Sequence, residues 1–192
     1  PDVPKFIAAH AKKLIDAWEQ AGKPANVRCL LSAHGLPEIV VKSGDPYQWQ
    51  VERTAAALKP LLPADWEIEI CYQSRVGPLK WIGPATDASI EKAATEGKAI
   101  LLSPVAFVSE HIETLVELDI EYRHLADKLG AKHYIRAPAL GIDEGFIGTL
   151  ADLVDQSLAD PDKTVRSSCG GRICPANWGD SPNRRMAATK AA

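Results

Sequence analysis

The segment VRCLLS, Val27–Ser32, is a short and mostly apolar run of the kind that forms a buried β-strand. The residues before it, Lys5–Gly22, place apolar side chains at the spacing of an amphipathic helix. The residues after it, AHGLPEIVVKSGDPY, are interrupted by glycine and proline and indicate a loop. A second helical pattern then occupies Gln48–Lys59 and is closed by Pro60. The segment that starts at Val27 therefore has a helix on each side of it in the sequence.

The same alternation continues along the chain. Further strands are predicted at Trp66–Ser74, Lys98–Val108 and Lys132–Ala137, and further helices at Asp87–Glu96, from about Glu110 to Leu129, and from about Gly145 to Leu158. Strands that alternate with helices favour a parallel sheet whose two faces are both covered. The predicted fold class is α/β, a parallel four-stranded sheet with helices on both faces, similar to half of a Rossmann-like enzyme of two domains.

Composition excludes some classes of function. The chain has 192 residues, of which 24% are charged and 46% hydrophobic, as in an ordinary globular domain. The formal net charge of −3 argues against nucleic acid as a partner, because such binders carry a basic excess. No apolar run reaches the roughly 18 residues of a transmembrane helix. We expect a cytoplasmic protein, with a peripheral contact to the inner membrane left open.

Unusual polar and aromatic residues follow three of the predicted strands. His34 comes after the first strand, Arg75 and Trp81 after the second, and Glu110 and His111 after the third. In open α/β sheets, ligands bind outside the carboxyl ends of the strands. The glycine pattern of dinucleotide-binding proteins, G-x-G-x-x-G, does not follow the first strand. The three loops therefore predict a site for a ligand other than a dinucleotide.

The third loop leads into an acidic segment, PVAFVSEHIETLVELDIEY, Pro104–Tyr122. On an α-helix with about 100° per residue, Glu110, Glu113, Glu117 and Glu121 fall within an arc of roughly 80°. Apolar residues occupy most of the remaining circle, so we expect a largely buried helix. No Lys or Arg follows Glu113 or Glu117 at i+4, so the acids repel each other or attract cations. The stripe is either a solvated helix face or a path for a divalent metal.

The other candidates each have a structural and a functional interpretation. His34 lies next to Gly35, which allows close backbone approach, and could serve as an acid, a base or a metal ligand. His111 alone is more typical of a helix start than of a metal ligand. Arg75 and Trp81 lie on a loop rich in glycine and proline, where the tryptophan would contact a flat aromatic ligand or act as an apolar cover. The three remaining histidines, His10, His124 and His133, have no expected role.

Three of these stretches together resemble the ferrochelatase family, which inserts ferrous iron into protoporphyrin. They are LLSAHGLPEIVVKSGDPYQWQ, CYQSRVGPLKWIGP and PVAFVSEHIETLVELDIEY, in the order and at the spacing of the family. The match covers the C-terminal half of the usual enzyme. The resemblance implies two similar α/β halves with the porphyrin between them, and a missing N-terminal half as a partner. It divides the chain into a leading helix at 1–26 that links to that half, a chelatase domain at 27–160, and a tail at 161–192.

The resemblance also implies the activity and the roles of residues. The reaction is that of a lyase, which joins Fe²⁺ and protoporphyrin IX, both substrates, into protohaem and releases two protons; we expect the isolated fragment to be inactive. His34 and Glu113 match the catalytic pair. Metal ligands would be His34, Glu113, Glu110 and Glu117; the metal or proton path would be His111, Glu117 and Glu121; Trp81 and Arg75 would contact the porphyrin. Imidazole with carboxylate suits ferrous iron without holding it as tightly as thiolates would.

The tail segment SSCGGRICPANWGD contains Cys169 and Cys174, the spacing of two ligands of the [2Fe–2S] cluster of animal ferrochelatases. A third tail cysteine of that pattern would fall at Arg166. A cluster needs four ligands, so a reduced pair of thiols is favoured over the cluster. Cys29 and Cys71 lie in strand-like runs and are expected to be buried.

Two alternative functions stay open at this point. One is a related chelatase that uses another metal or tetrapyrrole, such as cobalt or coproporphyrin. The other is a non-catalytic α/β module that binds metal through the acidic stripe.

Overall fold

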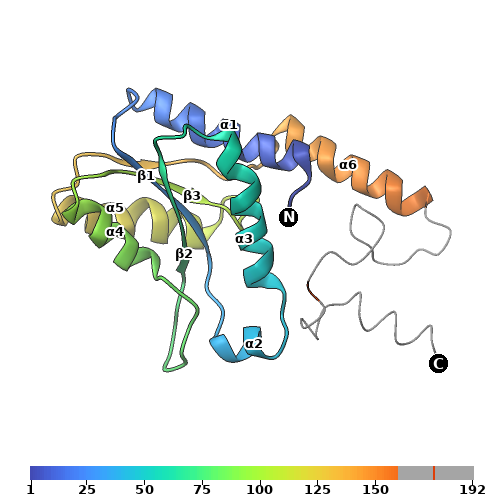
Figure 1. Cartoon of the computed structure of the whole chain (residues 1–192), viewed down its shortest axis with the longest axis horizontal. Helices are drawn as coiled ribbons and strands as arrows, with labels where there is room; N and C mark the ends of the chain where they lie inside the picture. The colour runs from blue at the N-terminus through green and yellow to red at the C-terminus, as the bar shows by residue number, and fades with distance from the viewer. Residues whose placement is uncertain (160–174, 176–192) are drawn as a thin grey trace.

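The computed structural model describes residues 1–159 and Pro175. Its centre is a four-stranded sheet of β1 (Val27–His34), β2 (Glu67–Gln73), β3 (Ala99–Pro104) and β4 (Tyr134–Arg136). All neighbouring strands run parallel, in the order β2-β1-β3-β4. All four carboxyl ends therefore meet at one edge of the sheet, where β1 lies between β2 and β3 (Figure 1).

Helices cover both faces of this sheet. Apolar residues of α1 (Pro4–Gln20) and α3 (Tyr47–Leu58) form one core cluster with the strands. Ile90 and Ala93 of α4 (Thr86–Thr95) belong to a second cluster, with Ala126 of α5 (Tyr122–Lys128). Remaining elements are the short α2 (Glu38–Lys42), the 3₁₀ turn η1 (Lys59–Leu61) and α6 (Glu144–Ala159), which runs beside the start of α1 and then beyond it (Figure 1).

The predicted α/β fold, with a parallel four-stranded sheet and helices on both faces, is confirmed. Strand ends differ by a few residues, and α2 forms inside the segment that the glycines and prolines predicted as loop. Among the described residues, none of the helices is long and apolar enough to cross a membrane. Most of the 161–192 tail, including Cys169 and Cys174, lies outside the described residues.

The acidic helix is the element for which the prediction was wrong. Glu113–Glu121 forms a π-helix, η2, and only the following Tyr122–Lys128 is α-helical. A π-helix closes hydrogen bonds from i to i+5, so a wheel of 100° per residue does not describe it. The segment is also not largely buried, because Ile112 is 73% exposed and Ile120 is 49% exposed. Only Thr114 and Leu118 of η2 are buried.

Candidate functional site

His34 is the last residue of β1 and lies at the carboxyl edge of the sheet. Its Nδ1 lies 2.7 Å from the carbonyl oxygen of Gly35. Since a carbonyl oxygen can only accept, Nδ1 is the donor, and the Nε2 atom of the neutral ring carries the lone pair. That Nε2 lies 3.9 Å from Oε2 of Glu113. The two side chains are 39% and 43% exposed, so a ligand can reach both.

Trp81 and Arg75, the aromatic and basic candidates, both pack against Gly35, the residue after His34. A Cβ on Gly35 would lie 3.0 Å from the carbonyl oxygen of Gln73, 3.1 Å from Trp81 Cε3 and 3.2 Å from Arg75 Cγ. The backbone of Trp81 bridges to Pro37, and its ring is half-buried. Arg75 is exposed, with its guanidinium 3.6 Å from Asp87. The structure therefore brings both predicted porphyrin contacts next to His34.

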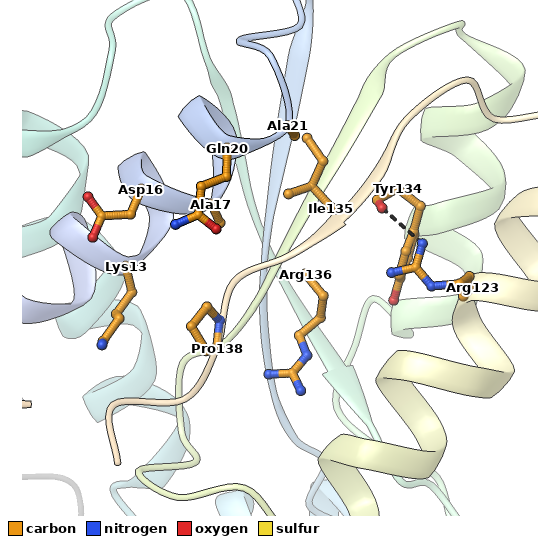
Figure 2. A pocket seen from close by; sticks show the side chains of 10 residues that line it. All are labelled: Lys13, Asp16, Ala17, Gln20, Ala21, Arg123, Tyr134, Ile135, Arg136 and Pro138. Atoms are coloured by element: carbon orange, nitrogen blue, oxygen red, sulfur yellow. Dashed lines mark hydrogen bonds between the residues drawn. The ribbon is translucent and has the colours of Figure 1, made fainter. Parts of the chain in front are cut away.

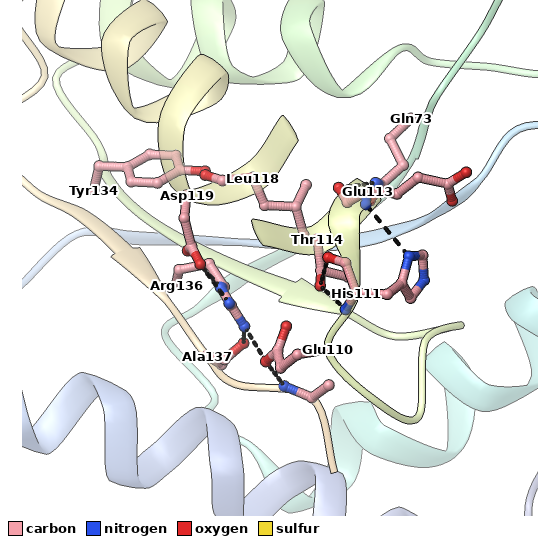
Figure 3. Close-up of polar contacts among 11 residues, drawn as sticks. Gln73, Glu110, His111, Glu113, Thr114, Leu118, Asp119, Tyr134, Arg136 and Ala137 are labelled. Atoms are coloured by element: carbon pink, nitrogen blue, oxygen red, sulfur yellow. Dashed lines mark hydrogen bonds and ion pairs between the residues drawn. The ribbon is translucent and has the colours of Figure 1, made fainter. Parts of the chain in front are cut away.

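Phe107 connects the two histidines of the site. It lies after β3 and is 9% exposed. Its ring centroid is 4.9 Å from that of His111 and 6.3 Å from that of His34. His111 in turn accepts a hydrogen bond from the amide of Glu113 on Nδ1, at 3.3 Å (Figure 3). Phe107 was not predicted from the sequence, because a single apolar residue in a loop carries no signal that distinguishes it.

Glu110 is bound by β4 and by the segment that follows that strand. Its carboxylate accepts hydrogen bonds from Arg136 at 2.5 Å and from the amide of Ala139 at 2.7 Å (Figure 3). Arg136 also binds Asp119 through two of its nitrogens. Burial alone would raise the pKa of Glu110, but hydrogen bonds from Arg136, Thr114 and Ala139 outweigh it and lower that pKa. The cation that the acidic segment lacks in sequence thus comes from β4.

Glu117 is bound on all sides by hydrogen-bond donors. Its Oε1 accepts from the backbone amide of Ser74 and the hydroxyl of Tyr122, both at 2.8 Å. Its Oε2 accepts from the side-chain amide of Gln73 at 3.0 Å and from the Ser74 hydroxyl. Glu121 is exposed at the end of η2. The four glutamates of the predicted stripe therefore have different surroundings.

The other histidines fit their structural interpretation. His10 is buried in α1, where its ring packs edge-on against Phe6. Burial lowers its pKa to about 4, so the ring is neutral at physiological pH. His124 lies exposed on α5 and His133 precedes β4. The two buried thiols, Cys29 and Cys71, are free cysteines.

No group of three or more His, Cys, Asp or Glu that could hold a metal ion occurs within residues 1–159 and 175. The His34–Glu113 pair offers one imidazole nitrogen and one carboxylate. Two ligands of a first-row metal, each at about 2 Å, can themselves be up to about 4 Å apart, so the observed 3.9 Å fits one ion between them. A cavity of about 430 Å³ lies elsewhere, between α1 and β4, and shares only Arg136 with the residues above (Figure 2).

Fold and site together define the class of the protein. It is an α/β domain with a histidine and a carboxylate exposed side by side at the carboxyl edge of a parallel sheet, the edge at which this class of fold binds ligands.

Comparison with known proteins gives the family. The family model described as ferrochelatase matches residues 1–158. The chain is 55% identical over 181 residues to the ferrochelatase of Hyphomonas neptunium, covering 94% of the chain and 50% of that protein. It is 54% identical to the ferrochelatase of Caulobacter vibrioides, covering 95% and 52%, and 44% identical to that of Rickettsia felis, covering 91% and 51%. The chain belongs to the ferrochelatase family, and it spans about half the length of these relatives.

Proposed function

We propose that this chain is the part of a ferrochelatase that delivers ferrous iron to protoporphyrin IX and receives the protons the ring releases, in the lyase reaction that forms protohaem. The observation that carries the proposal is the His34 Nε2 atom facing the Glu113 carboxylate at 3.9 Å at the exposed carboxyl edge of the sheet. The family match over residues 1–158 supports the reaction type.

The chemistry of metal insertion requires both side chains. The porphyrin has to lose two N–H protons while a dication arrives, so a base must lie close to the ring. In the neutral ring of His34, Nε2 carries the lone pair, because Nδ1 donates to Gly35. Glu113 supplies negative charge beside it. A mixed pair of nitrogen and oxygen ligands binds ferrous iron and still leaves positions open for the porphyrin nitrogens.

The surroundings of the pair fit a large flat substrate. We assign Trp81 and Arg75 to porphyrin contact, because both lie against Gly35, one residue from His34. Exposed apolar side chains follow the carboxyl ends of three of the strands: Ile39 and Val40 after β1, Val76 and Leu79 after β2, and Val108 and Ile112 after β3. An apolar macrocycle would cover such side chains, and so would a peripheral contact of this cytoplasmic protein with the membrane surface.

We assign the approach path to His111 and Glu121, with the iron itself held by His34 and Glu113. Glu110 and Glu117 remain candidates from the family pattern, but in this geometry Glu110 is neutralised by Arg136 and Glu117 accepts four hydrogen bonds. Their contribution to iron binding would require that these bonds open. A [2Fe–2S] cluster on Cys169 and Cys174 concerns residues outside the described part of the chain and takes no part in this proposal.

The remaining half of the protein would complete the cleft. Ile147, Leu150, Val154 and Leu158 lie on one side of α6 at helical spacing, and all four are exposed. An exposed apolar stripe on a helix that extends beyond its own domain is typical of a contact with another apolar surface. Because the relatives are about twice as long as this chain, we assign that surface to their other half and expect the chain alone to insert no iron.

A related chelatase for cobalt or for coproporphyrin would use the same pair, since imidazole and carboxylate bind several divalent metals. A metal-binding module without catalysis would bind the ion and leave porphyrin unchanged.

The test measures porphyrin metallation by absorbance in the complete protein that carries this chain. We expect iron insertion into protoporphyrin IX, and a loss of about 100-fold or more in kcat for His34→Ala and for Glu113→Gln, because each removes a group that carries a proton or the ion. His124→Gln, on the exposed face of α5, is the matched control and should keep full activity.

Parallel assays with Co²⁺ and with coproporphyrin identify the preferred pair of substrates. If the protein inserts Co²⁺ faster than Fe²⁺, or metallates coproporphyrin faster than protoporphyrin IX, the related chelatase is favoured. Binding of Fe²⁺ with no metallation of any porphyrin would favour the module. Full activity of the His34→Ala variant would remove His34 from the mechanism.

A further inference from the structure

Gln73 is a polar residue buried at the centre of the candidate site. It ends β2, is 1% exposed, and is the register partner of His34. Its carbonyl oxygen accepts the amide of Gly35 at 2.8 Å. Its side-chain oxygen accepts the hydroxyl of Ser32 at 2.8 Å, and its Nε2 donates to Glu117 at 3.0 Å. A buried amide with both ends satisfied fixes the two groups on either side of it.

The hydrogen-bond chain through Gln73 starts at α4. The hydroxyls of Thr86 and Ser32 lie 3.0 Å apart, and both residues are fully buried. Since Ser32 donates to Gln73, Thr86 is the donor to Ser32. One continuous chain therefore joins the first residue of α4, β1, the end of β2 and η2.

Ser74 and Tyr122 complete the surroundings of Glu117. Ser74 has a φ of 59°, a left-handed conformation that is unusual for serine and that lets its amide and its hydroxyl meet the same carboxylate. Burial, and then the neighbouring Glu117 carboxylate, raise the pKa of Tyr122, so its phenol stays a donor. A carboxylate has about four acceptor positions, and here four donors occupy them.

Glu117 lies in the middle of η2, four positions after Glu113. A π-helix is rare, usually extends for a single turn, and is frequent at functional sites, so a π-helix of nine residues requires a structural reason. Nε2 of Gln73 also reaches the carbonyl oxygen of Glu113 at 3.4 Å. The same side chain thus contacts the backbone of one member of the candidate pair, while its own backbone binds the residue after the other member.

We propose that Gln73, Ser74 and Tyr122 are positioning residues that bind Glu117 and thereby fix η2 so that Glu113 faces His34. The inference rests on the function proposed above and assigns Glu117 to anchoring η2 rather than to holding iron. We call these four residues, Gln73, Ser74, Glu117 and Tyr122, the Glu117 network.

The first experiment tests the anchor by hydrogen exchange on the chain described here, and needs no activity. In Gln73→Met and Ser74→Ala, we expect the backbone amides from Glu113 to Leu118 to exchange about tenfold faster than in the unmodified chain, because η2 loses donors to Glu117. Ser89→Ala is the matched control, since it removes another serine hydroxyl that donates to a glutamate, Glu69, between β2 and a helix. Unchanged exchange in both network variants would overturn the inference.

The second experiment uses iron insertion by the complete protein. We expect Gln73→Met and Ser74→Ala to lower kcat about 10- to 100-fold, as a misplaced reacting group does. We expect little change in KM for porphyrin, because Gln73 is buried and the Ser74 hydroxyl is bound to Glu117. Ser89→Ala should keep its kcat.

The double variant Gln73→Glu with Glu117→Gln tests whether Glu117 acts by holding η2 in position or by its own negative charge. It exchanges the amide and the carboxylate and can keep the bond between the two side chains. We expect it to recover most of the kcat lost in each single variant. If the double variant stays as slow as Glu117→Gln alone, Glu117 acts through its own charge and the inference fails. If the unmodified protein inserts no iron, the proposed function fails, while hydrogen exchange still decides whether the network holds η2.

Discussion

Gly35 has a backbone role that no other residue can fill without a shift. Its missing side chain leaves room for the carbonyl oxygen of Gln73, the ring of Trp81 and the stem of Arg75, all within 3.2 Å of where a Cβ would be. Contacts of that length are closer than ordinary packing, and one of the three atoms belongs to the backbone, which cannot rotate away. The loop after β1 and the loop after β2 therefore pack together through this glycine.

A methyl group at this position should separate the two loops. We expect Gly35→Ala to lower the free energy of unfolding by about 1–3 kcal/mol, the usual cost of overpacking, in urea denaturation. Gly148→Ala is the control, because a Cβ there meets nothing within 4 Å and alanine favours the helix. It should raise stability by up to about 1 kcal/mol. Equal stability of the Gly35→Ala chain would show that the loops adjust freely.

Single residues were predictable where the requirement is local. Gly35 beside His34 was predicted to allow close backbone approach, and the distances confirm that approach. Phe107 was missed because its role depends on two histidines from different loops. Two of the donors to Glu117, Gln73 and Ser74, were missed for the same reason. They are distant from η2 in the sequence, and nothing in the residues around them marks a contact with η2.

η2 shows what a periodic pattern leaves out. Helical periodicity in the sequence assumes hydrogen bonds from i to i+4, and nothing in ETLVELDIE marks the change to i+5. The apolar residues from position 112 to 120 were predicted to be mostly buried, yet Ile112, Leu115, Val116 and Ile120 are all exposed. Glu113 and Glu117 have no cation at i+4, as the sequence shows, while Glu110 and Asp119 are neutralised by Arg136 of β4, which a local pattern cannot include.

Arg136 neutralises Glu110 and Asp119 together, with its own side chain 9% exposed. We expect Arg136→Met to lower the free energy of unfolding at pH 7 by about 2 kcal/mol, less than for a fully buried pair because the two carboxylates are partly exposed. The pKa of Glu110 is lowered in the folded state, so this stabilisation is present above its ordinary pKa near 4.5 and is lost as the pH falls.

Urea denaturation from pH 7 to pH 3 checks the sign. The difference between the Arg136→Met variant and the unmodified chain should shrink below about pH 4.5. Lys128→Met, which removes an exposed cation from α5, should cost less than about 0.5 kcal/mol at any pH. A difference for Arg136→Met that is constant with pH would assign the loss to packing instead of charge.

The chain as a whole has a surface that its own core does not use. Phe146 and Thr149 of α6 are buried, whereas every residue from Leu150 onward in that helix is exposed except Leu153, which is partly buried. Isolated helical turns are marginal in water, so tertiary packing normally supplies their stability. The sequence predicted this helix and the need for another half, but it could not show which side of the helix would be uncovered.

Charged side chains on the uncovered side of α6 should lower the thermal stability of the complete protein. They should not change the stability of the chain by itself. We expect the double variant Leu150→Glu and Val154→Glu to lower the Tm of the complete protein by several degrees, as the loss of about 2 kcal/mol of apolar burial would. In the chain described here the Tm should change by less than about 2 °C. Gln156→Glu, on the opposite side of α6, is the control for both. Equal Tm values for the complete protein with and without the double variant would place the contact elsewhere.

The origin of His34 and Glu113 has a consequence for the newly made protein. His34 ends β1 and Glu113 follows β3, and only the assembled sheet brings the two side chains together. Contacts between distant parts of a chain form late, because a long loop must first be closed. On the function proposed above, an incompletely folded copy would lack this pair, so ferrous iron would be bound only by chains whose sheet has already formed.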